Sequence, residues 1–348
     1  MTPLATRRLG RTTVPVTELS FGGAGIGNLF TPVTDEQAHE AVTAAWDAGI
    51  RYFDTAPHYG LGLSERRLGA ALAGRDRATY TISTKAGRLL EPDPVPEPES
   101  GLMAGAPQTA DDLSDGGFAV PATHRRVWDF SADGVRRSLE ASLTRLGLDR
   151  IDVVYLHDPD DHAEQAFREA YPALERLRAE GVVGAIGAGM NQAEMLTRFV
   201  RDTDVDAVLC AGRYTLLDQR ALAELLPAAQ EHHVSVVIGG VFNSGLLADP
   251  RPGATYDYAA APEALLDRAG RFKALATRHG TTLRAAALAF PFGHPAVASV
   301  LVGTRSPHEV SDAVSQFRSR VPPDLWKEAR AEGLLPADTP TPEEDPLP

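Results

Sequence analysis

RYFDTAPHYGLGLSE, residues 51–65, is the stretch that decides the fold. Its apolar start at residues 52–53 predicts a short strand, and Asp54 stands where that strand ends. Proline and glycine then break the chain into a loop, and this loop presents Tyr59. The stretch therefore places an acid at a strand end and a phenol just beyond it.

A second strand follows after an intervening helix; it covers residues 80–84 and ends on Lys85. Because the carboxyl ends of the strands of a parallel barrel share one rim, Asp54, Tyr59 and Lys85 are expected within reach of one another. A tyrosine hydroxyl has a pKa of about 10, a nearby ammonium favours its ionised form, and a carboxylate keeps that ammonium charged and oriented. Each residue alone would more often be a helix cap, a packed ring or a surface charge. Together they predict a proton donor to a carbonyl, or an acceptor from an alcohol.

The rest of the chain repeats a strand-then-helix order. Most expected strands are short continuous apolar runs, which is typical of strands buried on both faces. The further strands are expected at residues 19–23, 152–157, 184–187, 207–210, 234–238 and 299–302. Helices are expected at residues 34–48, 132–146, 164–180, 191–201, 219–232 and 262–279. Eight strands in this order favour an α/β fold of the (β/α)8 TIM-barrel class over an open doubly wound sheet.

Sequence signals at both ends of the first unit refine this prediction. Residues 8–19 alternate around Gly10 and predict a β-hairpin that precedes the barrel. Thr34 and Gln37 form a capping box that opens the first helix.

Composition excludes several classes of protein. The 348 residues suit one large barrel domain, expected over residues 1–335, or two smaller ones, and 43% of them are hydrophobic. No apolar run reaches the roughly 18 residues of a membrane span, and residues 1–8 lack the apolar segment of a secretory signal. The single cysteine, Cys210, excludes an intrachain disulfide, lies in an apolar run and fits a reducing cytoplasm. A net charge of −13 argues against a nucleic-acid partner.

Two segments interrupt the strand-then-helix order. Residues 87–130, rich in Pro, Gly and Asp, join the third strand to the third helix at the rim that carries Lys85. Because so long a loop is usually functional or disordered, we interpret it as a lid that contributes to substrate specificity. The alternative is a surface excursion that never touches substrate. Residues 336–348, rich in Pro, Thr and acids, are expected to be a disordered tail.

Three motifs together resemble the signatures of the aldo-keto reductase superfamily: Asp54-Thr-Ala-x-x-Tyr59-Gly-x-Gly-x-Ser-Glu65, Ser83-Thr-Lys85 and Tyr155-Leu-His157. The resemblance covers residues 7–330. It implies a (β/α)8 barrel with the hairpin plugging its bottom, a nicotinamide cofactor bound without a Rossmann fold, and a catalytic tetrad. The tetrad carried over by position is Asp54, Tyr59, Lys85 and His157, in which His157 orients the carbonyl oxygen beside Tyr59.

The family's pattern for holding the nicotinamide is only partly present. Where the family has a Ser-Asn pair for the carboxamide, this chain offers Asn191 and Gln192. Phe242 stands where the family has a ring that stacks on the nicotinamide. The loop expected along the pyrophosphate supplies Asn243, Ser244, Gly245 and Leu247.

The segment expected at the adenosine end bears on the choice of cofactor. It contains Gly303, Thr304, Arg305 and Glu309. The Lys and Arg that NADP-specific relatives direct at the 2′-phosphate are missing, and Glu309 would repel that group while Arg305 could partly compensate. The resemblance therefore implies NAD, with NADP possible.

Finer details, such as the His157-Asp-Pro-Asp sequence and residues 184–192 and 211–218, are similar to the aldose 1-dehydrogenase branch. That branch includes D-threo-aldose (L-fucose) dehydrogenases, with L-galactose and pyridoxal 4-dehydrogenases close by. It implies oxidation of the anomeric hydroxyl of an aldose, or of another cyclic hemiacetal, to a lactone. Side chains expected near the substrate, each alternatively a solvated surface group, are His58, His124, Trp128 and Arg213.

Other functions stay open at this point. The chain is alternatively a pyridoxal dehydrogenase, a general NADPH-dependent aldehyde and ketone reductase, or a regulatory barrel without catalysis, which the complete tetrad argues against. The pair His232-His233 lacks acid or thiol companions at ligand spacing, so no metal is predicted. A small-molecule substrate, no membrane partner and either a monomer or a homodimer are expected.

Overall fold

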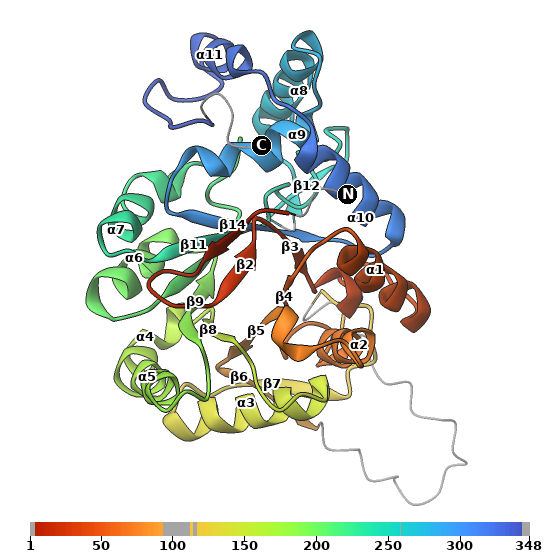
Figure 1. Cartoon of the computed structure of the whole chain (residues 1–348). Coiled ribbons are helices and arrows are strands. Elements are labelled where there is room, and N and C mark those ends of the chain that lie inside the picture. The colour runs from red at the N-terminus through yellow and green to blue at the C-terminus, as the bar shows by residue number, and fades with distance from the viewer. Residues whose placement is uncertain (1–3, 93–111, 114–116, 258, 343–348) are drawn as a thin grey trace, which may run out of the picture.

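The computed structural model describes residues 4–92, 112–113, 117–257 and 259–342. Within these ranges eight parallel strands close into a barrel, which Figure 1 shows. In chain order they are β3 (Leu19–Gly22), β4 (Tyr52–Asp54), β5 (Thr81–Ala86), β8 (Val153–His157), β9 (Ala185–Met190), β10 (Ala207–Ala211), β11 (Ser235–Gly239) and β14 (Val297–Gly303). The TIM-barrel prediction is confirmed, and every expected strand overlaps an observed one.

Helices surround this barrel on its outside (Figure 1). The helices before β9 are α1 (Asp35–Asp47), α2 (Leu63–Leu72) and α3 (Ala132–Leu146). They are followed by a continuous helical run of α4 (Ala163–Gln165), a π-helical segment (Ala166–Ala170) and α5 (Tyr171–Ala179). The later ones are α6 (Ala193–Asp202), α7 (Leu225–Glu231), α8 (Glu263–Arg278), α9 (Leu283–Ala289), α10 (Pro307–Arg318) and α11 (Pro323–Ala331). The capping box predicted for the first helix is present at Thr34 and Gln37.

The N-terminal hairpin closes the bottom of the barrel. Strands β1 (Thr6–Arg8) and β2 (Pro15–Thr17) pair antiparallel, and Leu9 between them is fully buried with the inward-facing side chains of the barrel. Gly10, at φ +51°, lies so close to the strand beginnings that a Cβ there would stand 2.3 Å from the carbonyl oxygen of Asp206. The turn is therefore restricted to glycine by both its conformation and its close approach.

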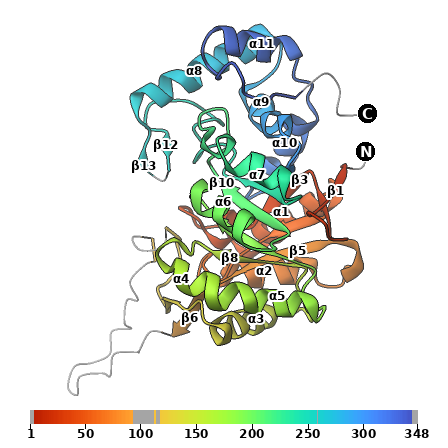
Figure 2. The same ribbon diagram turned by 90° about the vertical axis from the view of Figure 1, so that its left-hand side faces the viewer.

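The segment after β5 begins and ends as a β-ribbon, which differs from the expected structureless loop. Strand β6 (Arg88–Pro92) pairs antiparallel with β7 (His124–Trp128), so the two ends of the excursion satisfy each other's backbone hydrogen bonds. Figure 2 shows this ribbon on the side of the barrel opposite β1. Residues 93–111 and 114–116, the middle of the predicted lid, lie outside the described residues.

The C-terminal tail also differs from its prediction. Thr339 is 1% exposed, and Arg330 of α11 donates to the Thr339 carbonyl at 3.0 Å and to the Thr341 hydroxyl at 2.5 Å. Residues 336–342 therefore pack on the body of the protein because a helix supplies them with hydrogen-bond donors. Residues 343–348 lie outside the described residues.

Cys210 is buried in β10, and burial raises the pKa of its thiol to about 12, so it behaves as a small hydrophobic residue. Among the described residues, no helix combines the length and apolar character needed to cross a bilayer. The same residues contain no cluster of three or more His, Cys, Asp or Glu side chains arranged for a metal ion.

Candidate active site

A buried ion pair joins the ends of β4 and β5. The parallel register sets Asp54 beside Ser83, and the Lys85 Nζ atom donates to Asp54 Oδ2 at 2.7 Å and to the Thr55 carbonyl at 3.0 Å. Ser83 donates to the other carboxylate oxygen at 2.7 Å. Burial opposes the charge on Lys85, but Asp54 and Tyr59 outweigh it and raise the pKa of the ammonium. Lys85 therefore keeps its positive charge although its side chain is buried.

Tyr59 lies against this charge. Its ring centroid is 4.7 Å from Lys85 Nζ. The loop that carries Tyr59 turns at Gly60, whose φ is +61° and whose added Cβ would stand 2.2 Å from the Gly27 carbonyl oxygen. This turn packs the loop closely against the loop that follows β3, and so fixes the Tyr59 ring beside the Lys85 ammonium.

The remaining polar residues of the same motif fasten that loop. Ser64 donates to the Gly23 carbonyl at 2.7 Å. The fully buried Glu65 accepts from Thr84 at 2.7 Å with one carboxylate oxygen and from Arg145 of α3 at 2.5 Å with the other. Both side chains are thus structural supports that hold the loop in place.

His157 completes the predicted set at the end of β8. Its ring is perpendicular to that of Tyr59, with 6.0 Å between centroids. Burial, with the positive charges of Arg88 and Lys85, holds the pKa of His157 well below its ordinary value. Its Nδ1 atom is buried and has no hydrogen-bond partner among the described residues. The geometry thus offers a neutral imidazole to an oxygen placed beside Tyr59.

Sequence reasoning missed an arginine–aspartate pair at the mouth of this site. Arg88 forms an ion pair with Asp158, and its guanidinium lies 4.2 Å from the ring centroid of Trp128. Burial lowers the pKa of Arg88, and the carboxylate of Asp158 partly offsets that effect. The available signal was adjacency: Arg88 follows Lys85 by three positions, and Asp158 directly follows His157.

The residues predicted near the substrate separate into those at the site and those away from it. The His58 ring lies 5.6 Å from that of His157, and Trp128 reaches the site through Arg88. His124 pairs with Pro92 at the outer end of the ribbon, where its ring contacts Thr123 at 2.9 Å. The structure therefore brings His58 and Trp128 to the tetrad and leaves His124 at the far end.

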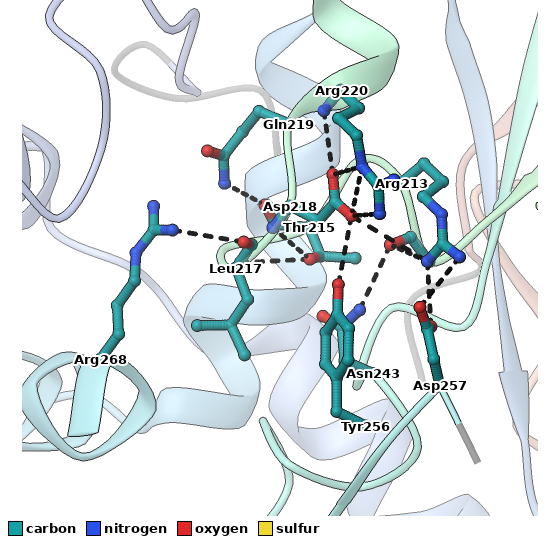
Figure 3. Close-up of polar contacts among 11 residues, drawn as sticks. Arg213, Thr215, Leu217, Asp218, Gln219, Arg220, Asn243, Tyr256, Asp257 and Arg268 are labelled. Atoms are coloured by element: carbon teal, nitrogen blue, oxygen red, sulfur yellow. Dashed lines mark hydrogen bonds and ion pairs between the residues drawn. The ribbon is translucent and has the colours of Figure 1, made fainter. Parts of the chain in front are cut away.

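Arg213 belongs to a polar cluster beyond β10, which Figure 3 shows. Its guanidinium binds Asp257 at 2.9 Å and lies 4.0 Å from Asp218. Asp218 also accepts from Arg220 at 2.6 Å and from the Tyr256 hydroxyl at 3.1 Å. Arg213 is thus committed to carboxylates of its own chain, where the sequence predicted a group that binds substrate hydroxyls.

The turn after β11 contains consecutive left-handed residues. Asn243, Ser244 and Gly245 have φ values of +46°, +57° and +97°, a conformation that is costly for the first two and typical of functional loops. Short strands β12 (Thr255–Tyr256) and β13 (Ala259–Ala260) form a hairpin against it, and Thr255 donates to the Ser244 carbonyl at 2.9 Å. The cluster of Figure 3 therefore supports this turn.

The turn after β11 also contains a buried hydrogen-bond acceptor without a protein partner among the described residues. Asn243 donates to the Gly212 carbonyl at 3.3 Å, while its Oδ1 atom is buried without a partner among the described residues. Phe242 is half-buried beside it and Leu247 is fully buried. A buried amide oxygen that lacks a protein partner fits a hydrogen bond from a bound group.

The segment after β14 carries the adenosine-end candidates. Thr304 is 3% exposed, and its Oγ1 atom has no hydrogen-bond partner among the described residues. Arg305 instead has a carboxylate partner, since its Nη2 atom lies 2.8 Å from Glu309 Oε1. Gly303 is exposed at the strand end. The positive charge of Arg305, expected to attract a 2′-phosphate in part, is therefore already paired with Glu309.

These candidate cofactor residues ring the same mouth as the tetrad. Asn191 and Gln192 follow β9, the Asn243 turn follows β11 and Thr304 follows β14. In the tetrad, Asp54, Lys85 and His157 come from β4, β5 and β8, and Tyr59 from the loop after β4. Strands β11 and β14 are neighbours in the barrel. With two orphaned buried oxygens on adjacent strand ends, the residues present fit a nicotinamide dinucleotide.

Comparison with known proteins agrees with this geometry. Residues 18–331 match the model of the aldo/keto reductase family. The chain is similar to D-threo-aldose 1-dehydrogenase of a Pseudomonas species, with 47% identity over 91% of this chain and 94% of that protein. It is 39% identical to pyridoxal 4-dehydrogenase of Microbacterium luteolum, over 94% of this chain and 97% of the relative. Identity to L-galactose dehydrogenase of Arabidopsis thaliana is 30% over 90% and 88% of the two chains.

Solved structures agree as well. An aldo-keto reductase from Bacillus halodurans, in its holo form, superposes with a TM-score of 0.72 at 26% identity, covering 98% of this chain and 99% of that one. The chain therefore belongs to the aldo/keto reductase family, whose members are NAD(P)H-dependent oxidoreductases.

Proposed function

We propose that this aldo/keto reductase oxidises the anomeric hydroxyl of an aldose to a lactone, with NAD as cofactor and Tyr59 as general base. The observation that carries the proposal is the position of the Tyr59 ring, 4.7 Å from a buried charged Lys85 and 6.0 Å from the ring of a neutral His157. A phenol in that position can give up its proton to become a base and take one from an alcohol.

Each member of the tetrad has one task in this reaction. Tyr59, as phenolate, takes the hydroxyl proton while the carbon loses hydride. Lys85 stabilises the phenolate, and Asp54 keeps the ammonium charged and directed at it. His157 is neutral, so one ring nitrogen can donate to the substrate oxygen and fix it beside Tyr59. In the reductive direction Tyr59 returns the proton to the oxygen.

The bound nicotinamide would supply hydride acceptance, which the chain's own side chains cannot provide. Asn191 or Gln192 would hold its carboxamide, Phe242 would pack near its ring and the Asn243 turn would lie along the pyrophosphate. At the adenosine end the Arg305–Glu309 pair supports NAD over NADP. A 2′-phosphate dianion would face the Glu309 carboxylate. It would also face Arg305, whose charge that carboxylate already neutralises at 2.8 Å.

The substrate class rests on the relatives together with the mouth of the site. A D-threo-aldose 1-dehydrogenase at 47% identity makes an aldose the first candidate. Around the tetrad, His58, Arg88 and Asp158 supply hydrogen-bonding groups suited to sugar hydroxyls. Pyridoxal is the second candidate, because a pyridoxal 4-dehydrogenase is 39% identical and pyridoxal forms a cyclic hemiacetal that the same groups could oxidise.

The test is a screen of aldoses and pyridoxal with NAD, in which NADH absorbance is followed. L-Fucose with NAD is compared with an aromatic aldehyde with NADPH, since a general carbonyl reductase would prefer the second pair. We expect Tyr59→Phe to lose about a hundredfold or more of the wild-type rate while it keeps the same thermal midpoint. A fully active Tyr59→Phe enzyme would refute the assigned role. Failure of every sugar and of pyridoxal, with intact fold, would favour a non-catalytic barrel.

A further inference from the structure

Arg126 of β7 links the excursion after β5 to the residue that precedes Tyr59. Its Nη1 and Nη2 atoms bind the two carboxylate oxygens of Asp112, each at 2.7 Å. Its Nε atom lies 2.6 Å from His58 Nδ1, and its Nη2 atom also lies 3.3 Å from the His58 carbonyl oxygen. Asp112 is 2% exposed, so this is a buried, bidentate contact and not a surface ion pair.

This contact fixes which nitrogen of His58 carries the proton. A guanidinium has N–H donors only and stays protonated in proteins. At 2.6 Å from Arg126 Nε, the Nδ1 atom of His58 can therefore only accept, so in the neutral ring the proton is on Nε2. Burial and the charges of Arg88, Arg126 and Lys85 lower the pKa of His58 to about 2, which agrees with a ring that stays neutral.

The donor so produced lies at the reacting centre. The His58 ring is 5.6 Å from that of His157, while Phe118 packs edge-on against it at 5.3 Å. No hydrogen bond joins His58 Nε2 to a described residue, and this atom is not fully buried. An oxygen of a bound molecule next to the reacting carbon is within reach of such a group.

We propose that Asp112 and Arg126 are positioning residues that lock His58 in its Nε2–H tautomer, so that His58 donates a hydrogen bond to a substrate oxygen adjacent to the carbon that loses hydride. His58 is then a hydrogen-bond donor to substrate, and its tautomer is fixed by Arg126 of β7, a strand outside the barrel. The part that concerns substrate rests on the proposed function; the tautomer lock does not.

The lock is tested without activity, by nitrogen NMR of protein labelled at histidine, with the His58 signals assigned from His58→Gln. We expect a bare Nδ1 and a protonated Nε2 between about pH 5 and pH 9, a range in which an ordinary histidine titrates. In Arg126→Met the lock is gone, so the neutral ring should populate both tautomers, while burial and the charges of Arg88 and Lys85 still oppose its protonation. A protonated Nδ1 in the wild-type protein, or His58 signals unchanged in Arg126→Met, would overturn the proposal.

Arg125→Met is the matched control. Arg125 is the next residue on β7, but its partner Glu91, at 2.7 Å, is partly exposed, as Arg125 is. Its removal should leave the His58 signals as they are in the wild type. Asp112→Asn gives a milder second variant if Arg126→Met does not fold, and it should show partial exchange of the two tautomers. If the His58 signals in Asp112→Asn match those of the wild type, Asp112 is not a positioning residue.

Kinetics then test the substrate contact. With an aldose and NAD, Arg126→Met should lower kcat/KM by about tenfold, the size expected of one hydrogen bond, and Arg125→Met should not. His58→Gln keeps an amide donor and should recover most of that loss when combined with Arg126→Met. If no sugar is oxidised but the tautomer is as stated, the proposed function fails and the lock stands. If sugars are oxidised at unchanged rate in Arg126→Met, the contact with substrate is wrong.

Discussion

Two parts of the same mouth are built in different ways. Asp54, Lys85 and His157 lie on barrel strands, where the parallel register sets each beside its neighbour. The Asn243 turn and the Arg305 segment lie on loops outside the barrel ladder, where turn hydrogen bonds and side-chain contacts hold them. In the proposed function the strand-held side chains support the chemistry of Tyr59, and the loop-held part contacts the cofactor. A strand-held charge is buried and costly to disturb, whereas a loop-held charge is partly exposed and tolerant of change.

Asp54→Asn should produce the largest effect, and it disturbs the strand-held part directly. Lys85, 2% exposed, would lose its carboxylate partner at 2.7 Å. Breaking a buried pair from one side costs about 3–5 kcal/mol of stability, and burial would then lower the pKa of Lys85 and weaken its support of Tyr59. We expect this loss in urea unfolding, with at least a hundredfold fall in turnover.

Asp35→Asn is the control for that measurement. Asp35 pairs with Arg67 at 2.8 Å, but its side chain is 87% exposed. Exposed pairs contribute up to about 1 kcal/mol, so this variant should unfold almost as the wild type does. Equal losses for Asp35→Asn and Asp54→Asn would contradict the distinction between the two kinds of charge.

Acid should destabilise the protein through the two histidines of the site. The pKa values of His157 and His58 are lowered in the folded state by burial and by Arg88. In the unfolded chain each histidine has the ordinary pKa of about 6.5. The unfolded chain then binds protons that the folded chain excludes, so stability is present above about pH 6.5 and falls below it. Each histidine contributes up to about 1.4 kcal/mol per pH unit.

His157→Gln isolates this contribution. Urea unfolding at pH 7 and pH 5 should show a smaller acid loss in His157→Gln than in the wild type. The exposed His39 on α1 is the control, since water surrounds it in both states and His39→Gln should keep the wild-type loss. An unchanged loss in His157→Gln would mean that the buried ring accepts its proton in the folded protein.

The same difference explains which parts of the molecule could be predicted from its sequence. The ends of β4, β5 and β8 follow from short apolar runs, and the parallel register then brings Asp54 and Lys85 together without further information. Arg88 and Asp158 were missed because their pairing depends on how far the long Arg88 side chain reaches from β6, which no local pattern encodes. Asp158 nevertheless directly follows His157, and Arg88 follows Lys85 by three positions.

Loops and tails were predicted least well for a related reason. The ends of residues 87–130 pair as a ribbon, since two distant segments satisfy each other's backbone groups. Thr339 is buried because Arg330 donates to it from α11, which composition cannot reveal. Arg213 was expected to meet substrate, but Asp257, 44 positions later in the chain, binds it. In each case the deciding partner lies at least nine positions away along the chain, beyond the reach of a local pattern.

Cofactor choice tests the loop-held part. Glu309→Gln would release Arg305 from its 2.8 Å partner and remove the charge that faces a 2′-phosphate. We expect the ratio of kcat/KM for NADP to that for NAD to rise by roughly tenfold, the size of one charge-assisted hydrogen bond. Glu140→Gln, which breaks an exposed pair with Arg136 on α3, should leave the ratio unchanged. An unchanged ratio in Glu309→Gln would remove this segment from the discrimination between cofactors.

Tyr256→Phe should have the smallest effect, because it removes one contact of a redundant cluster. Asp218 would lose the Tyr256 hydroxyl at 3.1 Å but keep Arg220 at 2.6 Å, so the loss of stability should be about 1 kcal/mol.

The position of Tyr256 gives that small effect a second readout. Thr255, its neighbour, donates to the Ser244 carbonyl in the turn expected along the pyrophosphate, so KM for NAD should rise by about two- to threefold, as for a fraction of one hydrogen bond. Tyr171→Phe on α5 removes a hydroxyl bonded to Glu175 at 2.8 Å, far in sequence from that turn, and should lower stability with KM for NAD unchanged. If both variants change KM equally, the cluster beyond β10 does not support cofactor binding, and the loop-held part of the mouth ends at the Asn243 turn.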